Sequence, residues 1–409
     1  MAAPLRDSSA SPCCSQNDDF VEMKITIVLG AFFPVPPLMG GAVEKVWFAL
    51  AQEFARLGHE VTQISRSHPD LPAAEEIEKV QHLRIRGHAQ PRSIVWLKWL
   101  DLLYSLRVRR VLPQADILVT NTFWLPFLVR RPDRGLVYVH VQRGPKGQMR
   151  WYAHVARLLA VSRAIADQIV AEAPHLRTKV RVIPNALPFR IDPAPHTREQ
   201  IVLFVGRVHP EKGLELFLRA LSRLPTEMRT GWKVRIVGPH ERHLGGGGDA
   251  FLQRMQELGE WSGVRVEWPG KIFDPADLAE EYRSSLVFVY PSVADTGEAL
   301  PVAPLEAMAH ACAPIVSDLP CFRDYIADGV TGFVFDQRGT EPEKNLAIRL
   351  ADLLGCGPEE IMRVGERARA KAAEFAVETV AQRYLEDFAS LLAPKRTADE
   401  MSDLSLTND

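Results

Sequence analysis

The sequence predicts an α/β protein of two domains, each a parallel β-sheet covered by helices on both faces. Short apolar runs rich in β-branched residues alternate with stretches of helical periodicity, which is typical of doubly wound sheets. The alternation stops at a proline-rich segment (183–200) and then starts again. The chain has 409 residues, more than one hydrophobic core usually serves. Two such sheets facing each other would leave a cleft between the domains.

The first domain is expected over residues 23–190. The run KITIVLG (24–30) predicts a buried strand. A helix should follow over 42–59, because its apolar residues recur every three or four positions and Gly58 supplies a stop signal. The next predicted strands are EVTQIS, DILVTN, GLVYVHV and LLAVS.

The second domain is expected over residues 195–375. Its first strand is IVLFVGR (201–207), and a helix should follow over 213–223. The further predicted strands are KVRIVG, VRVEWPG, LVFVYPS and APIVSD. Helices between these strands again favour a parallel sheet.

Composition narrows the class of protein. The formal charge of −2, from 49 basic and 51 acidic residues, gives no overall attraction to nucleic acid. Five cysteines without metal-ligand spacing are typical of a reduced, cytoplasmic protein. No apolar run approaches the roughly 18–20 residues of a membrane span. We expect residues 1–22 to be a disordered leader and 395–409 a disordered tail.

Ligands of open α/β sheets bind at the carboxyl ends of the strands, so loops that follow strands are the candidate site. In the first such loop Gly40 and Gly41 directly precede a helix. Backbone N–H groups there can approach an anion at the positive end of the helix dipole. The alternative is a plain turn that needs glycine for its backbone angles.

A second loop, FVGRVHPEKG (204–213), places Arg207 after a strand and Lys212 before a helix. The two cations can converge on a diphosphate, Arg207 through its forked guanidinium and Lys212 as a point charge. The alternative is a pair of solvated surface cations.

The third loop is GEALPVAPLE (297–306), with Glu298 and Glu306 eight positions apart. Pro304 is expected to start a helix, which would place Glu306 in its first turn, where any glutamate gains from the dipole. On a functional interpretation, Glu306 accepts hydrogen bonds from ribose hydroxyls and Glu298 lies nearer a reacting sugar. Otherwise Glu298 is only an exposed acid.

Six stretches taken together resemble the retaining glycosyltransferases of family 4, also called glycosyl transferases group 1. They include FVGRVHPEKGLELFLRAL, VRIVGPH, GEALPVAPLEAMA and IADGVTGFVFD, and the N-terminal half adds MGGAVEKVWFALAQEFARLGHEV and LLAVSRAIADQI…VRVIPNAL. The likeness covers about residues 24–390. It implies the GT-B fold, in which two Rossmann-like domains face an interdomain cleft. Glu298 and Glu306 match the spacing of the family's paired glutamates.

The resemblance implies roles for single residues. Arg207 and Lys212 would neutralise the departing diphosphate, Glu306 would hold the ribose, and Glu298 would contact the sugar. His140, which ends the GLVYVH strand, would also reach the sugar, although a histidine there is often only structural. These implied catalytic residues are His140, Arg207, Lys212 and Glu298. The implied donor contacts are Gly40, Gly41, Gly206, Arg207, Lys212, Lys271, Ile272, Glu298, Ala299, Leu300, Pro301 and Glu306.

The sequence differs from the family's common motifs at two places. Ala299-Leu300-Pro301 replaces its usual Phe-Gly run, and Ala311-Cys312-Ala313 replaces Ala-Cys-Gly. The first departure leaves the identity of the donor sugar open. Neither departure removes a charged group. Asn185 belongs to the family's IPN turn, where a structural role is expected.

The resemblance implies retaining transfer of a hexose from a UDP- or GDP-linked sugar to a glycan or lipid-linked acceptor, in cell-surface polysaccharide or glycoconjugate synthesis. The C-terminal domain would bind the donor and the N-terminal domain the acceptor, and a helix over about 376–392 would cross back to the N-terminal domain. We expect no cofactor and no metal ion, because the sequence has no Asp-x-Asp and scattered histidines. A nucleotide-sugar epimerase of the same fold and a catalytically silent nucleotide-sugar-binding protein remain alternatives.

A helical stretch over 93–113 interleaves aromatic and basic side chains. They are Trp96, Trp99 and Tyr104 with Lys98, Arg107, Arg109 and Arg110. Such a helix can rest on the inner face of a membrane that carries the acceptor. The alternative is a core helix with one solvated face.

Overall fold

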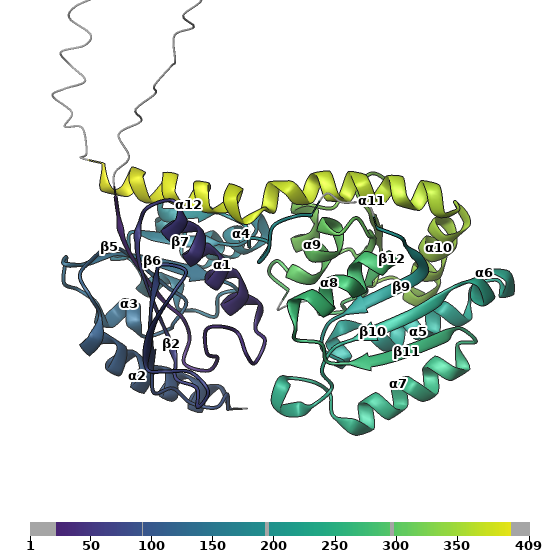
Figure 1. Cartoon of the computed structure of the whole chain (residues 1–409), viewed down its shortest axis with the longest axis horizontal. Coiled ribbons are helices and arrows are strands. Elements are labelled where there is room, and N and C mark those ends of the chain that lie inside the picture. Colours follow the sequence, from purple (N-terminus) through teal and green to yellow (C-terminus); the bar gives the residue numbers. More distant parts are fainter. Residues whose placement is uncertain (1–21, 92, 193–195, 295–297, 394–409) are drawn as a thin grey trace, which may run out of the picture.

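The computed structural model describes residues 22–91, 93–192, 196–294 and 298–393. The expected tail lies outside these residues, as does the expected leader except for Glu22. Two α/β halves stand side by side, the first in purple and blue and the second in green (Figure 1). The predicted fold class is confirmed, because each half is built on its own mainly parallel sheet.

The first half contains an eight-stranded sheet in the order β3-β4-β2-β1-β5-β6-β7-β8. The strands are β1 Lys24–Val28, β2 Glu60–Arg66, β3 Ala74–Ile77, β4 Val80–Ile85, β5 Ala115–Thr120, β6 Arg134–Val141, β7 Arg157–Ala160 and β8 Val180–Val182. All neighbours are parallel except β3 and β4, which form an antiparallel hairpin at the edge. The sequence patterns missed the edge strands β3 and β8 and the neighbouring β4, because these strands are short or alternate with polar and charged residues.

Helices cover both faces of this sheet. They are α1 Ala42–Arg56, α2 Ile94–Val111, α3 Leu125–Leu128 and α4 Arg163–Glu172. Helix α1 buries Val46, Trp47, Leu50 and Phe54, which recur at helical spacing and pack with Ile25 and Ile27 of β1 in one core cluster. On the opposite face, α2 contributes Tyr104 and Val108 to a second cluster.

The second half contains a six-stranded sheet in the order β11-β10-β9-β12-β13-β14, in which all neighbouring strands are parallel. Its strands are β9 Glu199–Val205, β10 Lys233–Val237, β11 Arg265–Gly270, β12 Ser285–Tyr290, β13 Ala313–Ser317 and β14 Phe333–Phe335. Its helices are α5 Leu214–Ser222, α6 Thr226–Gly231, α7 Asp249–Trp261, α8 Pro275–Ser284, α9 Val302–Ala309, α10 Pro342–Gly355 and α11 Pro358–Ala372.

Helix α12 (Val377–Leu392) joins the end of the chain to the first half. It continues from α11 along the top of the molecule (Figure 1). Its Tyr384 ring lies 5.2 Å from the ring of Trp47 on α1. Asp387 accepts a hydrogen bond of 2.8 Å from the Tyr138 hydroxyl and pairs with Arg157 at 3.2 Å. Asp387 also pairs with Arg181 of β8 at 3.4 Å. The helix therefore has an apolar face and two ion pairs that hold it to the N-terminal sheet.

Several hydrogen bonds connect the halves, among them one of 2.8 Å from the N–H of Arg163 to the Asp324 carboxylate. The Asn185 amide donates to the carbonyl of Leu300 at 2.9 Å, and the N–H of Leu187 donates to the carbonyl of Phe375 at 2.8 Å. Among the described residues, no helix has both the length and the apolar character of a bilayer-spanning segment.

Candidate active site

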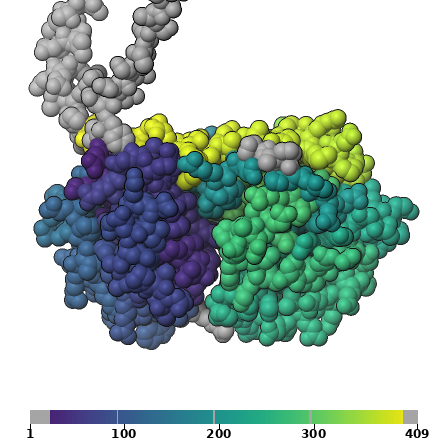
Figure 2. Space-filling view, in the orientation of Figure 1, coloured from purple at the N-terminus to yellow at the C-terminus, as the bar shows by residue number. Residues whose placement is uncertain are grey.

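A cleft of about 2280 Å³ separates the two halves. Figure 2 shows it as a hollow between the purple and green surfaces. We call its lining residues between 33 and 185 the N-terminal wall and those between 205 and 321 the C-terminal wall. All three loops that the sequence singled out contribute to this cleft, because the strands they follow end at its edge.

Lys212 lies at the end of a 3₁₀ turn (Pro210–Lys212) after β9, and only 8% of it is exposed. The following Gly213 has a positive φ of 71°, and a Cβ there would lie 1.9 Å from the carbonyl oxygen of Pro291. Only glycine therefore lets this turn approach the loop after β12 so closely. That approach brings Lys212 to Tyr290 and Glu298.

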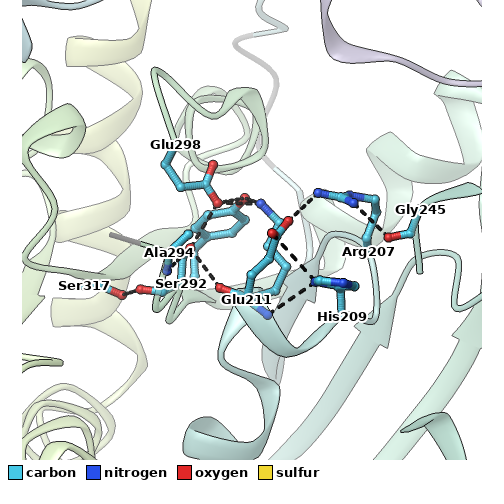
Figure 3. Close-up of polar contacts among 10 residues, drawn as sticks. Arg207, His209, Glu211, Gly245, Ser292, Ala294, Glu298 and Ser317 are labelled. Atoms are coloured by element: carbon cyan, nitrogen blue, oxygen red, sulfur yellow. Dashed lines mark hydrogen bonds and ion pairs between the residues drawn. The ribbon is translucent and has the colours of Figure 1, made fainter. Parts of the chain in front are cut away.

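Glu298 and Lys212 form a nearly buried ion pair. Lys212 Nζ also donates to the Tyr290 hydroxyl at 2.8 Å. The same carboxylate oxygen of Glu298 accepts hydrogen bonds from Tyr290 at 3.1 Å and from Ser292 at 3.0 Å. Burial, followed by the charge of Glu298, raises the pKa of Tyr290 well above its usual value. This network fixes the Glu298 carboxylate in the cleft (Figure 3).

Arg207 reaches the cleft from the same loop. Its guanidinium pairs with the Glu211 carboxylate and donates to the carbonyl of Gly245 at 2.8 Å (Figure 3). Both cations that the sequence singled out thus line one wall, and each already has a carboxylate partner. An anionic ligand would exchange with these carboxylates rather than find bare cations.

Glu306 lies on α9, lines the cleft and is largely buried. The expectation that Pro304 starts this helix is wrong, because α9 begins at Val302 and Pro304 occupies its third position. Proline fits there because the first N–H groups of a helix have no intrahelical acceptor. Glu306 consequently sits beyond the first turn, and its carboxylate accepts a hydrogen bond of 2.9 Å from the Tyr282 hydroxyl.

Gly40 and Gly41 line the opposite wall at the start of α1. A Cβ on Gly41 would lie 2.2 Å from a carboxylate oxygen of Glu44. Glu44 is only 6% exposed, and burial raises its pKa to about 7. Sequence reasoning missed Glu44, since a glutamate in the first turn of a helix is ordinary. Its signal appears only in the fold, where the carboxyl group is buried beside the glycine pair.

His140 is not brought to the wall of the cleft. It is 3% exposed, accepts a hydrogen bond of 2.9 Å from the Trp47 indole, and its pKa is lowered to about 3 by burial. Gln142, two residues further, lines the cleft and lies 3.1 Å from the His140 ring. The contact of His140 with a sugar stays a prediction. In this arrangement His140 could act on a sugar only through Gln142 or after a rearrangement.

Most of the remaining candidate residues line the cleft, and one does not. Gly206, Ile272 and the Ala299-Leu300-Pro301 run line the cleft. Lys271 is not among the lining residues, and its ammonium pairs with Glu241 at 2.7 Å. Asn185, for which a structural role was expected, both lines the cleft and tethers Leu300. Within the described parts of the chain, no group of three His, Cys, Asp or Glu side chains could hold a metal ion.

Two family models match the chain. The model described as glycosyl transferases group 1 matches residues 189–371, and the model described as glycosyltransferase family 4 matches residues 39–189. Together they span most of the sequence, one for each half of the fold. The chain belongs to the group 1 glycosyltransferases.

Full-length relatives support this membership. The chain is 24% identical over 393 residues to spore coat protein SA of Bacillus subtilis, covering 89% of this chain and 98% of that protein. It is 23% identical over 386 residues to a lipopolysaccharide 1,2-N-acetylglucosaminetransferase of Salmonella typhimurium, with 89% and 97% coverage.

Solved structures of glycosyltransferases show the same fold. The Anabaena protein HepE, in complex with UDP and glucose, superposes with a TM-score of 0.66 at 16% identity, over 90% of this chain and all of that one. Sucrose-phosphate synthase from Thermosynechococcus elongatus gives a TM-score of 0.70 at 18% identity, over 90% and 99%. At this identity the likeness establishes the GT-B fold of this glycosyltransferase and nothing finer.

Proposed function

We propose that this glycosyltransferase moves a hexose from a UDP- or GDP-linked sugar to a glycan or lipid-linked acceptor, with retention at the anomeric carbon. The observation that carries the proposal is the meeting of Arg207, Lys212, Glu298 and Glu306 on one wall of the cleft. Several relatives are named for glycan or glycolipid assembly, among them the lipopolysaccharide enzyme and a phosphatidyl-myo-inositol mannosyltransferase. Cell-surface polysaccharide or glycoconjugate synthesis is therefore the proposed setting.

The donor would occupy the C-terminal wall. Glu306, oriented by Tyr282, would accept hydrogen bonds from the vicinal ribose hydroxyls. The diphosphate would take the place of Glu211 beside Arg207 and would share Lys212 with Glu298. Ile272 lines the same wall and would face the base. Glu298, held by three donors, would remain next to the sugar.

Departure of the diphosphate is the charge-developing step. The bond between the anomeric carbon and the phosphate oxygen breaks, and its electron pair leaves with the diphosphate. Arg207 and Lys212 would stabilise that charge, so we propose that the reaction needs no metal ion. The acceptor oxygen bonds to the same face of the anomeric carbon, and its proton passes to the departing phosphate oxygen.

The proposal is tested by a donor screen with the full chain. Release of nucleotide from UDP-, GDP- and ADP-sugars is measured with extracted lipids or oligosaccharides as acceptors, and the anomeric configuration of the product is read by NMR. We expect release that depends on both donor and acceptor. Conversion of the donor sugar without any acceptor would favour the epimerase. Binding of the donor without release of nucleotide would favour the catalytically silent protein. If no nucleotide sugar bound at millimolar concentration, the transferase, the epimerase and the silent binding protein would all be refuted.

Helix α2 favours a peripheral membrane contact near the cytoplasmic face. Val95, Trp96 and Trp99 are 77%, 60% and 53% exposed, which a core helix with one solvated face does not explain. Asp101, the helix's sole acid, is buried and accepts hydrogen bonds from the N–H groups of Phe123 and Trp124. The exposed surface of α2 therefore offers aromatic and basic groups to anionic lipid headgroups.

Vesicle flotation tests this contact. The full chain should float with phosphatidylglycerol-containing vesicles and less with phosphatidylcholine alone, and Trp96→Ser with Trp99→Ser should abolish flotation. Trp261→Ser, at a 62% exposed position of the other half, is the matched control and should change nothing. Equal loss in the control would remove α2 as the contact.

A further inference from the structure

The two walls of the cleft carry opposite charge balances. On the C-terminal wall, Arg207, Lys212 and Arg242 are outnumbered by Glu211, Glu241, Asp249, Glu298 and Glu306. On the N-terminal wall the lining cations are Lys45, Arg143 and Lys146, and the lining acid is Glu44. Glu44 is buried beside Gly41, and burial raises its pKa to about 7. The N-terminal wall is therefore cationic near neutral pH.

The three cations of the N-terminal wall lack partners among the described residues. Across the described residues, the side chains of Lys45, Arg143 and Lys146 make no ion pair and no hydrogen bond within the chain. This contrasts with Arg207 and Lys212 opposite, each of which has a carboxylate partner. Lys45 is half-buried, and Arg143 and Lys146 are exposed. Like charges gathered on one wall of a cleft raise its potential and attract an anion.

The loop that carries two of these cations is held in place by its backbone. Glu172 of α4 accepts hydrogen bonds from the N–H groups of Gly147 at 2.7 Å and Met149 at 2.6 Å. Gly144 lies so close to α4 that a Cβ there would be 2.4 Å from the Gln168 amide oxygen. The carboxylate of Glu172 thus accepts hydrogen bonds from the backbone and does not pair with Lys146. Among the described residues, Arg143 and Lys146 have no ion-pair partner on the cleft wall.

We infer that the acceptor of this glycosyltransferase carries a phosphate monoester, which the N-terminal wall binds through Arg143, Lys146 and Lys45. The inference rests on the proposed function, since it concerns the second substrate of the same cleft. Arg207 and Lys212 supply one cation for each charge of a donor diphosphate, so the three further cations of the opposite wall can bind a second anion. Phosphate suits them best, because a guanidinium grips two of its oxygens while ammonium groups act as point charges.

Binding to the full chain tests the inference without turnover. Titrations of glucose 6-phosphate, glucose and glucuronate are followed by saturation-transfer NMR, with and without saturating UDP or GDP. We expect glucose 6-phosphate to bind more tightly than both others. Arg143→Gln with Lys146→Gln should weaken its binding by roughly tenfold or more, since each charged hydrogen bond contributes about 1.5–3 kcal/mol. Nucleotide affinity should stay unchanged.

The control is Arg223→Gln with Arg383→Gln, which removes the same charge from exposed positions outside the cleft. It should leave binding of glucose 6-phosphate intact. The inference would be overturned if glucuronate bound as tightly as glucose 6-phosphate, or if glucose 6-phosphate bound no more tightly than glucose. It would also be overturned if the control variant lost as much glucose 6-phosphate binding as the Arg143 and Lys146 variant. If the unmodified protein bound neither UDP nor GDP, the proposed function would be refuted instead.

A second arm uses the natural acceptor pool. Lipid and oligosaccharide extracts that support nucleotide release are treated with alkaline phosphatase or mock-treated. The inference expects acceptor activity to fall by roughly tenfold or more after phosphatase, in line with the loss of a charged contact. Unchanged activity would show that the acceptor needs no phosphate monoester.

Discussion

The C-terminal and N-terminal walls of the cleft differ in how their charged side chains are paired. On the C-terminal wall, Arg207 and Lys212 are paired with Glu211 and Glu298, so cations and hydrogen-bond acceptors stand side by side. On the N-terminal wall the cations have no partner in the part of the chain that the structure describes, and Glu44 is buried. The first arrangement suits a ligand that offers both charges and hydroxyl donors, and the second suits a net anion. The difference shows that the partners of the charged side chains in a site indicate its ligand as much as the charges themselves do.

The largest effect is expected from Lys212→Ala on the C-terminal wall. The change removes a cation from the proposed diphosphate and leaves the Glu298 carboxylate largely buried without its partner. Nucleotide release should fall by about 10²–10³-fold, measured as kcat/KM with the preferred donor.

Lys233→Ala is its control, because Lys233 forms an exposed pair with Glu199 at 3.0 Å on the same sheet. Exposed pairs contribute little, so the rate should be unchanged. If Lys212→Ala left kcat/KM within a factor of two of the parent, the assignment of the C-terminal wall to the donor would fail.

The next effect concerns Glu44 and the pH dependence of stability. Because its pKa is raised from 4.5 to about 7, the folded protein holds a proton there that the unfolded chain releases between these values. The free energy of unfolding should therefore fall as pH rises from 4.5 to 7, by up to ~3 kcal/mol from this group. Glu44→Gln should remove that component in urea titrations at pH 5 and pH 8.

Glu260→Gln supplies the comparison at an exposed position of α7, and the parent's pH dependence should persist in it. If Glu44→Gln also kept the full dependence, the N-terminal wall would carry an ionised carboxylate. Its positive balance would then be smaller than we infer.

A smaller effect is expected from Gly41→Ala. The residue has a φ of 102°, and the added Cβ would meet Glu44, so we expect a loss of about 1–2 kcal/mol in unfolding free energy. Gly147→Ala has a similar φ of 92° but open space around it. Urea midpoints of both variants separate backbone strain, which they share, from the steric clash. Equal losses would mean that Glu44 moves aside freely.

The smallest effect is expected from Tyr282→Phe, which removes one hydrogen bond to Glu306. One such bond contributes about 1 kcal/mol, so calorimetry should show donor affinity falling several-fold with little change in kcat. A kcat effect with unchanged affinity would place Glu306 nearer the reacting carbon than the ribose.

Local motifs predicted the C-terminal wall well because its residues lie in short contiguous stretches. Arg207 and Lys212 belong to one strand-to-helix loop, and Glu298 and Glu306 to another, so spacing alone indicated their common place at the strand ends. Lys271 and His140 also follow or end strands, yet a surface ion pair and the side chain of Trp47 hold them away from the cleft. Those contacts come from distant parts of the chain.

By itself, the sequence determined two parallel-sheet domains and the loops that carry the candidate chemistry, because hydrophobic periodicity and strand-end position are local properties. The tertiary structure alone decided which charges are paired, that Glu44 is buried, and that Gln142 rather than His140 lines the cleft. The physical reason is that burial and ion pairing depend on neighbours distant in sequence, brought together when α12 and the two sheets pack.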